Sequence, residues 1–231
     1  MGKLLVIEGV DSSGKATQAK KLLENLKNLN YDVQSIEFPD YKSDSSALVK
    51  MYLGGKFGKN ADDVSPYAAS AFFAVDRVAS YITGWKKSLA DGKIVLADRY
   101  TTSNFIHQAA KISDKNEKDN FLEWVSDFEY NKLGLPKPDL TIFLDMPVPY
   151  AKMLMANRPN KIDNSKTLDI HESDTEYLNH SYENAHYVAD KFGWHKISCV
   201  KDEKAGTIDE VRSIDDIAEE IFCEVKKALQ K

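Results

Sequence analysis

The most constraining feature of the sequence is a glycine-rich segment near its start, GVDSSGKAT, which covers residues 9–17. It follows a short apolar run, Leu4 to Ile7, and precedes a stretch whose leucines recur every three or four residues. A buried strand, a GxxxxGK segment and a helix in this order form a phosphate-binding loop, or P-loop. The chain is therefore expected to fold around a parallel strand whose carboxyl end carries an anion site.

Each part of this loop has a physical task in holding phosphate. Gly9 and Gly14 allow backbone conformations and a close approach that a Cβ would block. Successive amides and the N-terminus of the following helix supply partial positive charge, and Lys15 adds a full charge. The residues predicted to bind a nucleoside triphosphate are Gly9, Ser12, Ser13, Gly14, Lys15, Ala16 and Thr17.

Position 16 departs from the common form of the loop. In the common form, the residue after the lysine is a Ser or Thr that ligates Mg²⁺. Here that residue is Ala16, and the next hydroxyl belongs to Thr17. Mg²⁺ keeps several waters and needs one or two carboxylates besides phosphate oxygens. We therefore expect Asp11 and Asp98 to hold Mg²⁺ together with phosphates and water. Ala16 is also the one observation that favours a non-catalytic nucleotide-binding protein.

The rest of the chain alternates short apolar runs with amphipathic segments. Apolar runs at 33–38, 94–97, 140–144 and 196–200 predict four further strands, with helices between them. Such alternation forms a mostly parallel sheet with helices on both faces and a ligand site at the carboxyl ends of the strands. We expect one domain over residues 1–231 with the three-layer P-loop NTPase α/β fold, a five-stranded parallel sheet flanked by helices.

A long helix is predicted from Pro66 to Leu89, with Ser65 as its N-cap. Apolar residues recur along it at helical spacing, and we expect them to face the rest of the domain. This predicted inward stripe consists of Ala71, Phe72, Val75, Val78, Ala79, Ile82 and Trp85.

Composition and charge exclude several classes of protein. The formal net charge is −5, so a nucleic-acid-binding protein would need a strong local basic patch, which the sequence lacks. No apolar run approaches the ~18 residues that span a bilayer, and no signal peptide precedes the first strand. Cys199 and Cys223 lack the spacing of a zinc site or a disulfide framework and are expected to be buried thiols. We expect a cytoplasmic protein with no nucleic-acid or membrane partner.

A second nucleotide motif is found at residues 160–163, which read NKID and match the guanine-selecting NKxD pattern of GTPases. In a GTPase this motif should follow a buried strand, whereas here it follows a predicted helix and Pro159. The DxxG match, Asp11 to Gly14, lies inside the P-loop itself. A motif counts only in its structural context, so a GTPase is the weaker alternative.

Further motifs, in this order along the chain, make the sequence resemble the thymidylate kinase family. They are EGVDSSGKATQ at 8–18, FPDY at 38–41, FFAVDR at 72–77, DRYTTSN at 98–104, LDMP at 144–147 and LDIHE at 168–172. The resemblance implies Mg²⁺-dependent phosphorylation of dTMP to dTDP with ATP as donor. It also implies a homodimer packed through helices that include the long one. A kinase for another nucleotide, such as dUMP or dGMP, is the nearest alternative.

The resemblance also assigns roles to individual residues. Phe73 would stack on the thymine ring, Arg77 would hydrogen-bond its carbonyl edge, and Asn104 would lie beside the base. Arg99 would contact the dTMP phosphate and the transferring group. Sequence pattern alone predicts other roles for these residues. Phe73 would be a core residue and Asn104 would cap a helix N-terminus. Arg77 would form a surface ion pair, and Arg99 would form a salt bridge with Asp98. The residues expected to bind substrate are Asp11, Phe38, Pro39, Tyr41, Phe73, Arg77, Arg99, Ser103, Asn104, His107 and Gln108, and those expected to act in catalysis are Lys15, Arg99, Asp11 and Arg158.

A polar stretch without periodicity at about residues 157–171 resembles the mobile lid of this family. A catalytic arginine of the family lies either in the P-loop or in the lid. Ser12 occupies the P-loop position, so the lid is expected to supply the charge through Arg158, with Lys161 and Lys166 as further cations.

Overall fold

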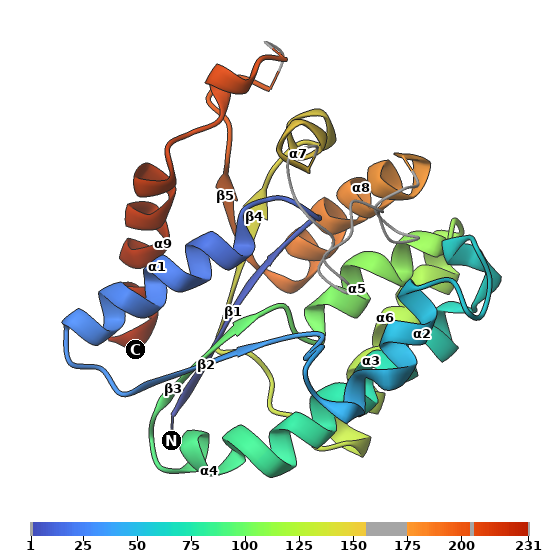
Figure 1. Ribbon diagram of the computed structural model, residues 1–231, viewed down its shortest axis with the longest axis horizontal. Helices are drawn as coiled ribbons and strands as arrows, with labels where there is room; N and C mark the ends of the chain where they lie inside the picture. Colours follow the sequence, from blue (N-terminus) through green and yellow to red (C-terminus); the bar gives the residue numbers. More distant parts are fainter. Residues whose placement is uncertain (1, 156–174, 204–205, 231) are drawn as a thin grey trace.

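The computed structural model describes residues 2–155, 175–203 and 206–230. The predicted lid with Arg158, and the NKID motif, lie outside the described residues. The strands are β1 (Lys3–Gly9), β2 (Val33–Glu37), β3 (Ile94–Asp98), β4 (Leu140–Asp145) and β5 (His195–Ser198). They form one parallel sheet in the order β2-β3-β1-β4-β5, so the predicted five-stranded parallel sheet is confirmed (Figure 1).

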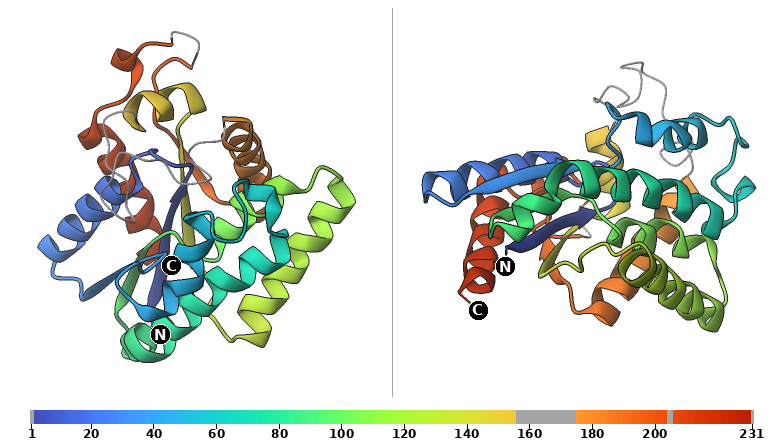
Figure 2. Two further views of the ribbon diagram at one scale, coloured as in Figure 1. Left: turned by 45° about the vertical axis from the view of Figure 1, so that its right-hand side comes forward. Right: turned by 90° about the horizontal axis from the view of Figure 1, so that it is seen from below.

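Helices cover both faces of this sheet (Figures 1 and 2). The α-helices of the described residues are α1 (Lys15–Asn28), α2 (Ala47–Leu53), α3 (Pro66–Ser80), α4 (Lys86–Ala90), α5 (Thr102–His107), α6 (Lys115–Ser126), α7 (Val148–Met155), α8 (Thr175–Phe192) and α9 (Ile214–Leu229). Two π-helical turns follow α3 and α6, namely η3 (Tyr81–Trp85) and η5 (Asp127–Lys132). Helices α1 and α9 lie on one face, and α4, α5, α6 and α8 on the other.

Alternate residues of the central strand belong to different cores. Leu5 and Ile7 of β1 pack with α1 and α9, whereas Leu4 and Val6 pack with Trp85 on the opposite face. Each buried aliphatic side chain of this size stabilises the fold by roughly 1.5–3 kcal/mol. Because both faces of β1 are covered, the carboxyl end of the strand is the place where a ligand can approach it.

The predicted inward stripe of the long helix is wrong in part. Helices α3 and α4 form one continuous helical run through η3, as predicted, but Val75 is 50% exposed and Ile82 is 65% exposed. The face turned into the domain instead carries the buried side chains of Ser70, Asp76 and Arg77. Buried charges are tolerated when they are paired, and the partners of the Asp76 and Arg77 charges come from other elements. The apolar periodicity therefore extends onto an outer face of the helix.

The two cysteines differ in their surroundings, although both are free. Cys199 is buried as predicted, and this burial raises the pKa of its thiol to about 12. Cys223 is exposed, so its predicted burial is wrong. Helix α9 buries Ile221 and Val225, which are four residues apart, and position 223 faces away from them. Within the described residues, no helix combines the length and apolar character needed to cross a membrane.

Candidate active site

The P-loop connects β1 to α1 at the carboxyl edge of the sheet. A Cβ at Gly9 would lie 2.4 Å from Ser13 Oγ and 3.0 Å from the Leu144 carbonyl oxygen, so the loop has room only for glycine there. Gly14 has φ 88°, in the left-handed region that favours glycine. It is also the N-cap of α1 and provides no side-chain cap. The first-turn amides of α1 therefore lack a side-chain acceptor and suit an anionic ligand.

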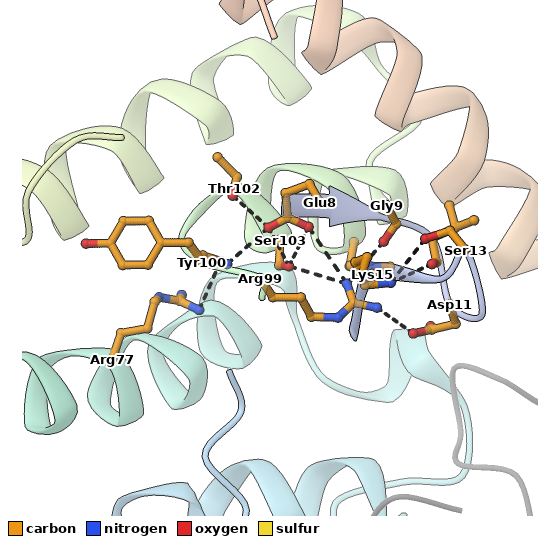
Figure 3. A network of polar contacts seen from close by, with 12 residues as sticks. Glu8, Gly9, Asp11, Ser13, Lys15, Arg77, Arg99, Tyr100, Thr102 and Ser103 are labelled. Atoms are coloured by element: carbon orange, nitrogen blue, oxygen red, sulfur yellow. Dashed lines mark hydrogen bonds and ion pairs between the residues drawn. The ribbon is translucent and has the colours of Figure 1, made fainter. Parts of the chain in front are cut away.

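Lys15 lies buried under this loop, with its ammonium turned back toward the preceding residues. Its Nζ donates to the Val10 carbonyl oxygen at 2.6 Å and lies 3.5 Å from Ser13 Oγ (Figure 3). All residues predicted to bind the triphosphate, except Gly9, line one cavity, which we name the donor pocket. Its remaining lining consists of Gln18, Met146, Leu154, Val211, Arg212, Ile214 and Ile217.

A second cavity, which we name the acceptor pocket, is lined by every residue predicted to bind substrate. Leu53 of α2 and Tyr100 also line it and were not predicted. These residues come from the P-loop, the segment after β2, α2, α3, and the segment after β3 with α5. The strands β1, β3 and β2 are neighbours, so the segments that follow them meet at one edge of the sheet.

The Arg99 guanidinium lies between the P-loop and α5 (Figure 3). Its Nη2 donates to Asp11 Oδ1 at 2.5 Å, so the alternative pairing with Asp98 is wrong. Its Nη1 lies 2.9 Å from His107 Nε2 and 3.4 Å from Ser103 Oγ. The arginine is thereby held from two sides, with its planar fork at the border of the acceptor pocket.

Arg99 also has an unusual backbone conformation. Its φ is 68°, in the left-handed region, which costs a residue other than glycine on the order of 1 kcal/mol. Its amide donates to the Ile7 carbonyl oxygen at 3.1 Å, which continues the contact between β3 and β1. Burial opposes the charge, but the carboxylates of Asp11, Glu8 and Asp98 outweigh it and keep the pKa of Arg99 above its ordinary value. The guanidinium therefore stays charged wherever the protein is folded.

Glu8 is a site residue that the sequence interpretation missed. Its buried carboxylate accepts hydrogen bonds from the Tyr100 amide at 3.1 Å, from Thr102 Oγ1 at 2.7 Å and from Ser103 Oγ at 2.9 Å (Figure 3). It thus anchors the segment that carries Arg99. A charged residue inside a run that is otherwise apolar and buried was the available signal, because such a group must be paired.

Arg77 and Asn104 occupy different surroundings from those that pattern alone predicts. Arg77 is 1% exposed and pairs with Glu129, which is 0% exposed, through two contacts of 2.6 Å. It is therefore not a surface ion pair. Asn104 lies inside α5 rather than at its N-cap, and its Nδ2 donates to the same carboxylate at 2.8 Å. Glu129 was also missed, since no motif surrounds it and its partners come from distant elements.

Phe73 is partly buried on α3, lines the acceptor pocket and contacts Tyr52 edge to face, with ring centroids 6.2 Å apart.

Lys111 links Tyr52 to the segment that precedes α3 through hydrogen bonds. Its Nζ donates to Tyr52 Oη at 2.9 Å, to the Ala61 carbonyl oxygen at 2.6 Å and to the Val64 carbonyl oxygen at 3.1 Å. Burial lowers the pKa of Lys111 to about 8, because neutral acceptors compensate its charge only partly.

This shifted pKa predicts a pH dependence of stability. The pKa of Lys111 is about 8 in the folded protein, against an ordinary value of 10.5, so between these values the unfolded chain binds more protons. Rising pH must then favour the folded state. From pH 8 to 10 we expect the free energy of unfolding of the wild type to rise by about 2 kcal/mol relative to Lys111→Gln.

Urea denaturation at several pH values measures this difference. The matched control is Lys115→Gln, which replaces an exposed lysine four positions later in the chain and retains Lys111. Its free energy of unfolding should rise over this pH range as that of the wild type does. A wild-type advantage that stays constant or falls across this pH range would contradict the assignment.

Known proteins are similar to this chain over most of its length. The family model described as thymidylate kinase matches residues 7–203. The chain belongs to the thymidylate kinase family. The resemblance derived from the sequence motifs is therefore confirmed.

Relatives within this family come from distant organisms. A probable thymidylate kinase of Thermococcus onnurineus is 34% identical over 168 residues, which cover 72% of this chain and 77% of the relative. The thymidylate kinase of Mycobacterium tuberculosis is 33% identical over 175 residues, covering 75% and 79%. A solved thymidylate kinase from Candida albicans superimposes with a TM-score of 0.70 at 22% identity, covering 98% of this chain and 93% of that one. The last comparison supports the fold.

Proposed function

We propose that this thymidylate kinase family member transfers the γ-phosphoryl group of ATP to dTMP and forms dTDP. The observation that carries the proposal is that the two pockets meet within one loop. Asp11 lines the acceptor pocket, and the next residue, Ser12, begins the lining of the donor pocket. A triphosphate and a monophosphate bound on the two sides of this loop would bring donor and acceptor phosphates together.

The proposed chemistry needs charge neutralisation and alignment rather than a general base. The second pKa of a phosphate monoester is about 6, so the attacking phosphate of dTMP is mostly dianionic at neutral pH. Lys15 would neutralise the donor phosphates, and Arg99 would bind the acceptor phosphate and the transferring group. Asp11 contacts Arg99 directly, which supports a role in orienting the guanidinium rather than in accepting a proton.

Mg²⁺ fits this site as an ion held mainly by the nucleotide. Among the described residues, no three His, Cys, Asp or Glu side chains come together as a metal cage. Asp11 follows β1 and Asp98 ends β3, and these two strands are neighbours in the sheet. Two carboxylates, together with phosphate oxygens and waters, satisfy the coordination of Mg²⁺. Thr17 lines the donor pocket and adds a hydroxyl near Ala16. When bound, Mg²⁺ would neutralise charge on the donor phosphates.

We further propose that residues 1–231 form a single domain and that the lid predicted at about 157–171 supplies Arg158 as an additional cation. This part of the proposal rests on the sequence alone. The arginine would act on charge that develops on the transferring group, as cations near a phosphoryl transfer generally do.

An ADP-release assay with a panel of monophosphates tests the proposed activity. We expect dTMP to have the highest kcat/KM, with dUMP as the next substrate because it lacks only the 5-methyl group of thymine. Tight ATP binding without turnover of any monophosphate would instead support a non-catalytic binding protein. If GTP but not ATP displaced a nucleotide bound at the P-loop, a GTPase would be supported.

We also propose a homodimer that packs through the exposed face of α3. Val75 and Ile82 lie on this helical run and are exposed by half or more of their surfaces, and large apolar residues gathered on one helix face suit an interface. The double substitution Val75→Glu with Ile82→Glu is expected to convert the dimer to a monomer, because it places charges in an apolar contact.

Sedimentation velocity of the wild type and the variant measures the oligomeric state. Leu29→Glu is the matched control, since Leu29 is 52% exposed at the end of α1 and lies outside α3. A monomeric wild type, or a double variant that remains dimeric, would refute the proposed interface.

A further inference from the structure

A buried carboxylate that the proposed chemistry does not use lies behind the acceptor pocket. Glu129 of η5 accepts four hydrogen bonds. Its Oε1 accepts from Arg77 Nη2 at 2.6 Å and from Asn104 Nδ2 at 2.8 Å, and its Oε2 accepts from Arg77 Nε at 2.6 Å and from Thr101 Oγ1 at 3.0 Å. Glu129 does not line the pocket itself. It can therefore act on a ligand only through the side chains that it holds.

The hydrogen bonds of Asn104 determine which end of its amide is available to a ligand. Its Nδ2 donates to Glu129 Oε1 and, at 3.3 Å, to the Ser70 carbonyl oxygen. A carboxylate and a carbonyl group only accept, so the amide nitrogen must face them. The Oδ1 acceptor is then the group that Asn104 offers to the acceptor pocket. An acceptor matches the N3–H donor of thymine or uracil, whereas N3 of cytosine is itself an acceptor.

Glu129 holds Arg77 in the same way. It binds Nε and Nη2 through both of its oxygens, a bidentate arrangement that fixes the plane of the guanidinium. The remaining terminal nitrogen, Nη1, lies 3.4 Å from the Tyr100 carbonyl oxygen. Both Arg77 and Tyr100 line the acceptor pocket. A guanidinium only donates. It therefore suits the keto oxygen at C4 of thymine or uracil and opposes the amino group at C4 of cytosine.

We propose that Glu129 is a positioning residue that makes the acceptor site specific for pyrimidines with a keto group at C4 and a proton on N3. It does so by fixing a donor, Arg77, and an acceptor, Asn104, in the order that thymine requires and cytosine cannot match. This inference rests on the proposed function and names the part of the fold that determines its base specificity.

The test compares dTMP with dCMP in the wild type and in Glu129→Gln. The amide of glutamine would place an NH₂ group against donors of Arg77, Thr101 or Asn104, so the Asn104 amide would be free to turn. We expect the ratio of kcat/KM for dTMP to that for dCMP to fall at least ~10-fold, mainly through the KM of dTMP. The KM of ATP should not change. Glu123→Gln, which alters an exposed glutamate of α6, is the matched control and should behave as the wild type.

A purely structural role would give a different result. If Glu129→Gln lowers the melting temperature and reduces activity on both substrates equally, with an unchanged ratio, the inference is overturned. Should this variant not fold, Glu129→Asp keeps the charge but shortens the reach to Arg77 and Asn104, and its ratio must also fall. An unchanged ratio in a folded Glu129→Asp would equally overturn the inference. A wild type that does not phosphorylate dTMP at all would instead refute the proposed function.

Discussion

Replacing Lys15 with alanine is expected to lower kcat by at least ~100-fold. The Lys15 ammonium is buried under the P-loop, and its charge lies where the donor phosphates would be held. Within the part of the chain that the structure describes, the donor pocket is lined by one further lysine or arginine, Arg212, which lies outside the P-loop. The lost charge therefore cannot be replaced by a neighbouring side chain on the P-loop.

Steady-state kinetics with saturating dTMP and ATP measure this effect, and calorimetric titration of dTMP separates it from acceptor binding. We expect the Kd of dTMP to change less than about threefold, because Lys15 does not line the acceptor pocket. Lys20→Ala, on the exposed side of α1, should retain wild-type kcat. Near-normal turnover in folded Lys15→Ala would contradict the proposed role.

Replacing Arg99 with alanine is expected to lower kcat/KM for dTMP by at least ~100-fold and to weaken dTMP binding as well. Arg99 lines the acceptor pocket, and its contacts with Asp11 and His107 hold the guanidinium in place. Arg99→Lys should rescue little of the loss. A lysine ammonium lacks the planar fork needed to contact Asp11 and a phosphate at the same time.

The same kinetic and calorimetric measurements distinguish Arg99 from Lys15. Only the Arg99 variants should combine a lower kcat with a Kd for dTMP that is raised about tenfold or more. Circular dichroism must show a folded protein, since Arg99 also neutralises Asp11 and lies near Glu8. If Arg99→Lys had full activity, charge alone would suffice and the bidentate role would be wrong.

Much of the fold was predictable because it depends on local patterns. Short apolar runs indicated all five strands, and their alternation with helices indicated a parallel sheet. The P-loop was predictable in detail, since Gly9 and Gly14 are required by a close approach and a left-handed turn that sequence spacing already implies. Motifs also indicated which residues line the acceptor pocket, although their roles remain predictions.

Other features could not be predicted because they join residues that are far apart in the sequence. Glu8 and Glu129 are separated from their partners by 25 to 95 positions, and nothing in their neighbourhood indicates which donors will reach them. The exposure of Val75 and Ile82 was misjudged for a related reason. An apolar helix stripe can face either a core or a partner surface, and periodicity does not distinguish the two.

Residue spacing within short segments was enough to predict the phosphate-binding loop, the five strands and the family. The carboxylates that hold Arg99, Arg77 and Asn104, and the buried face of α3, became known only from the packing of distant segments. A buried charge is stable only where folding brings it a partner, and that partner is set by how the strands and helices pack rather than by neighbouring residues.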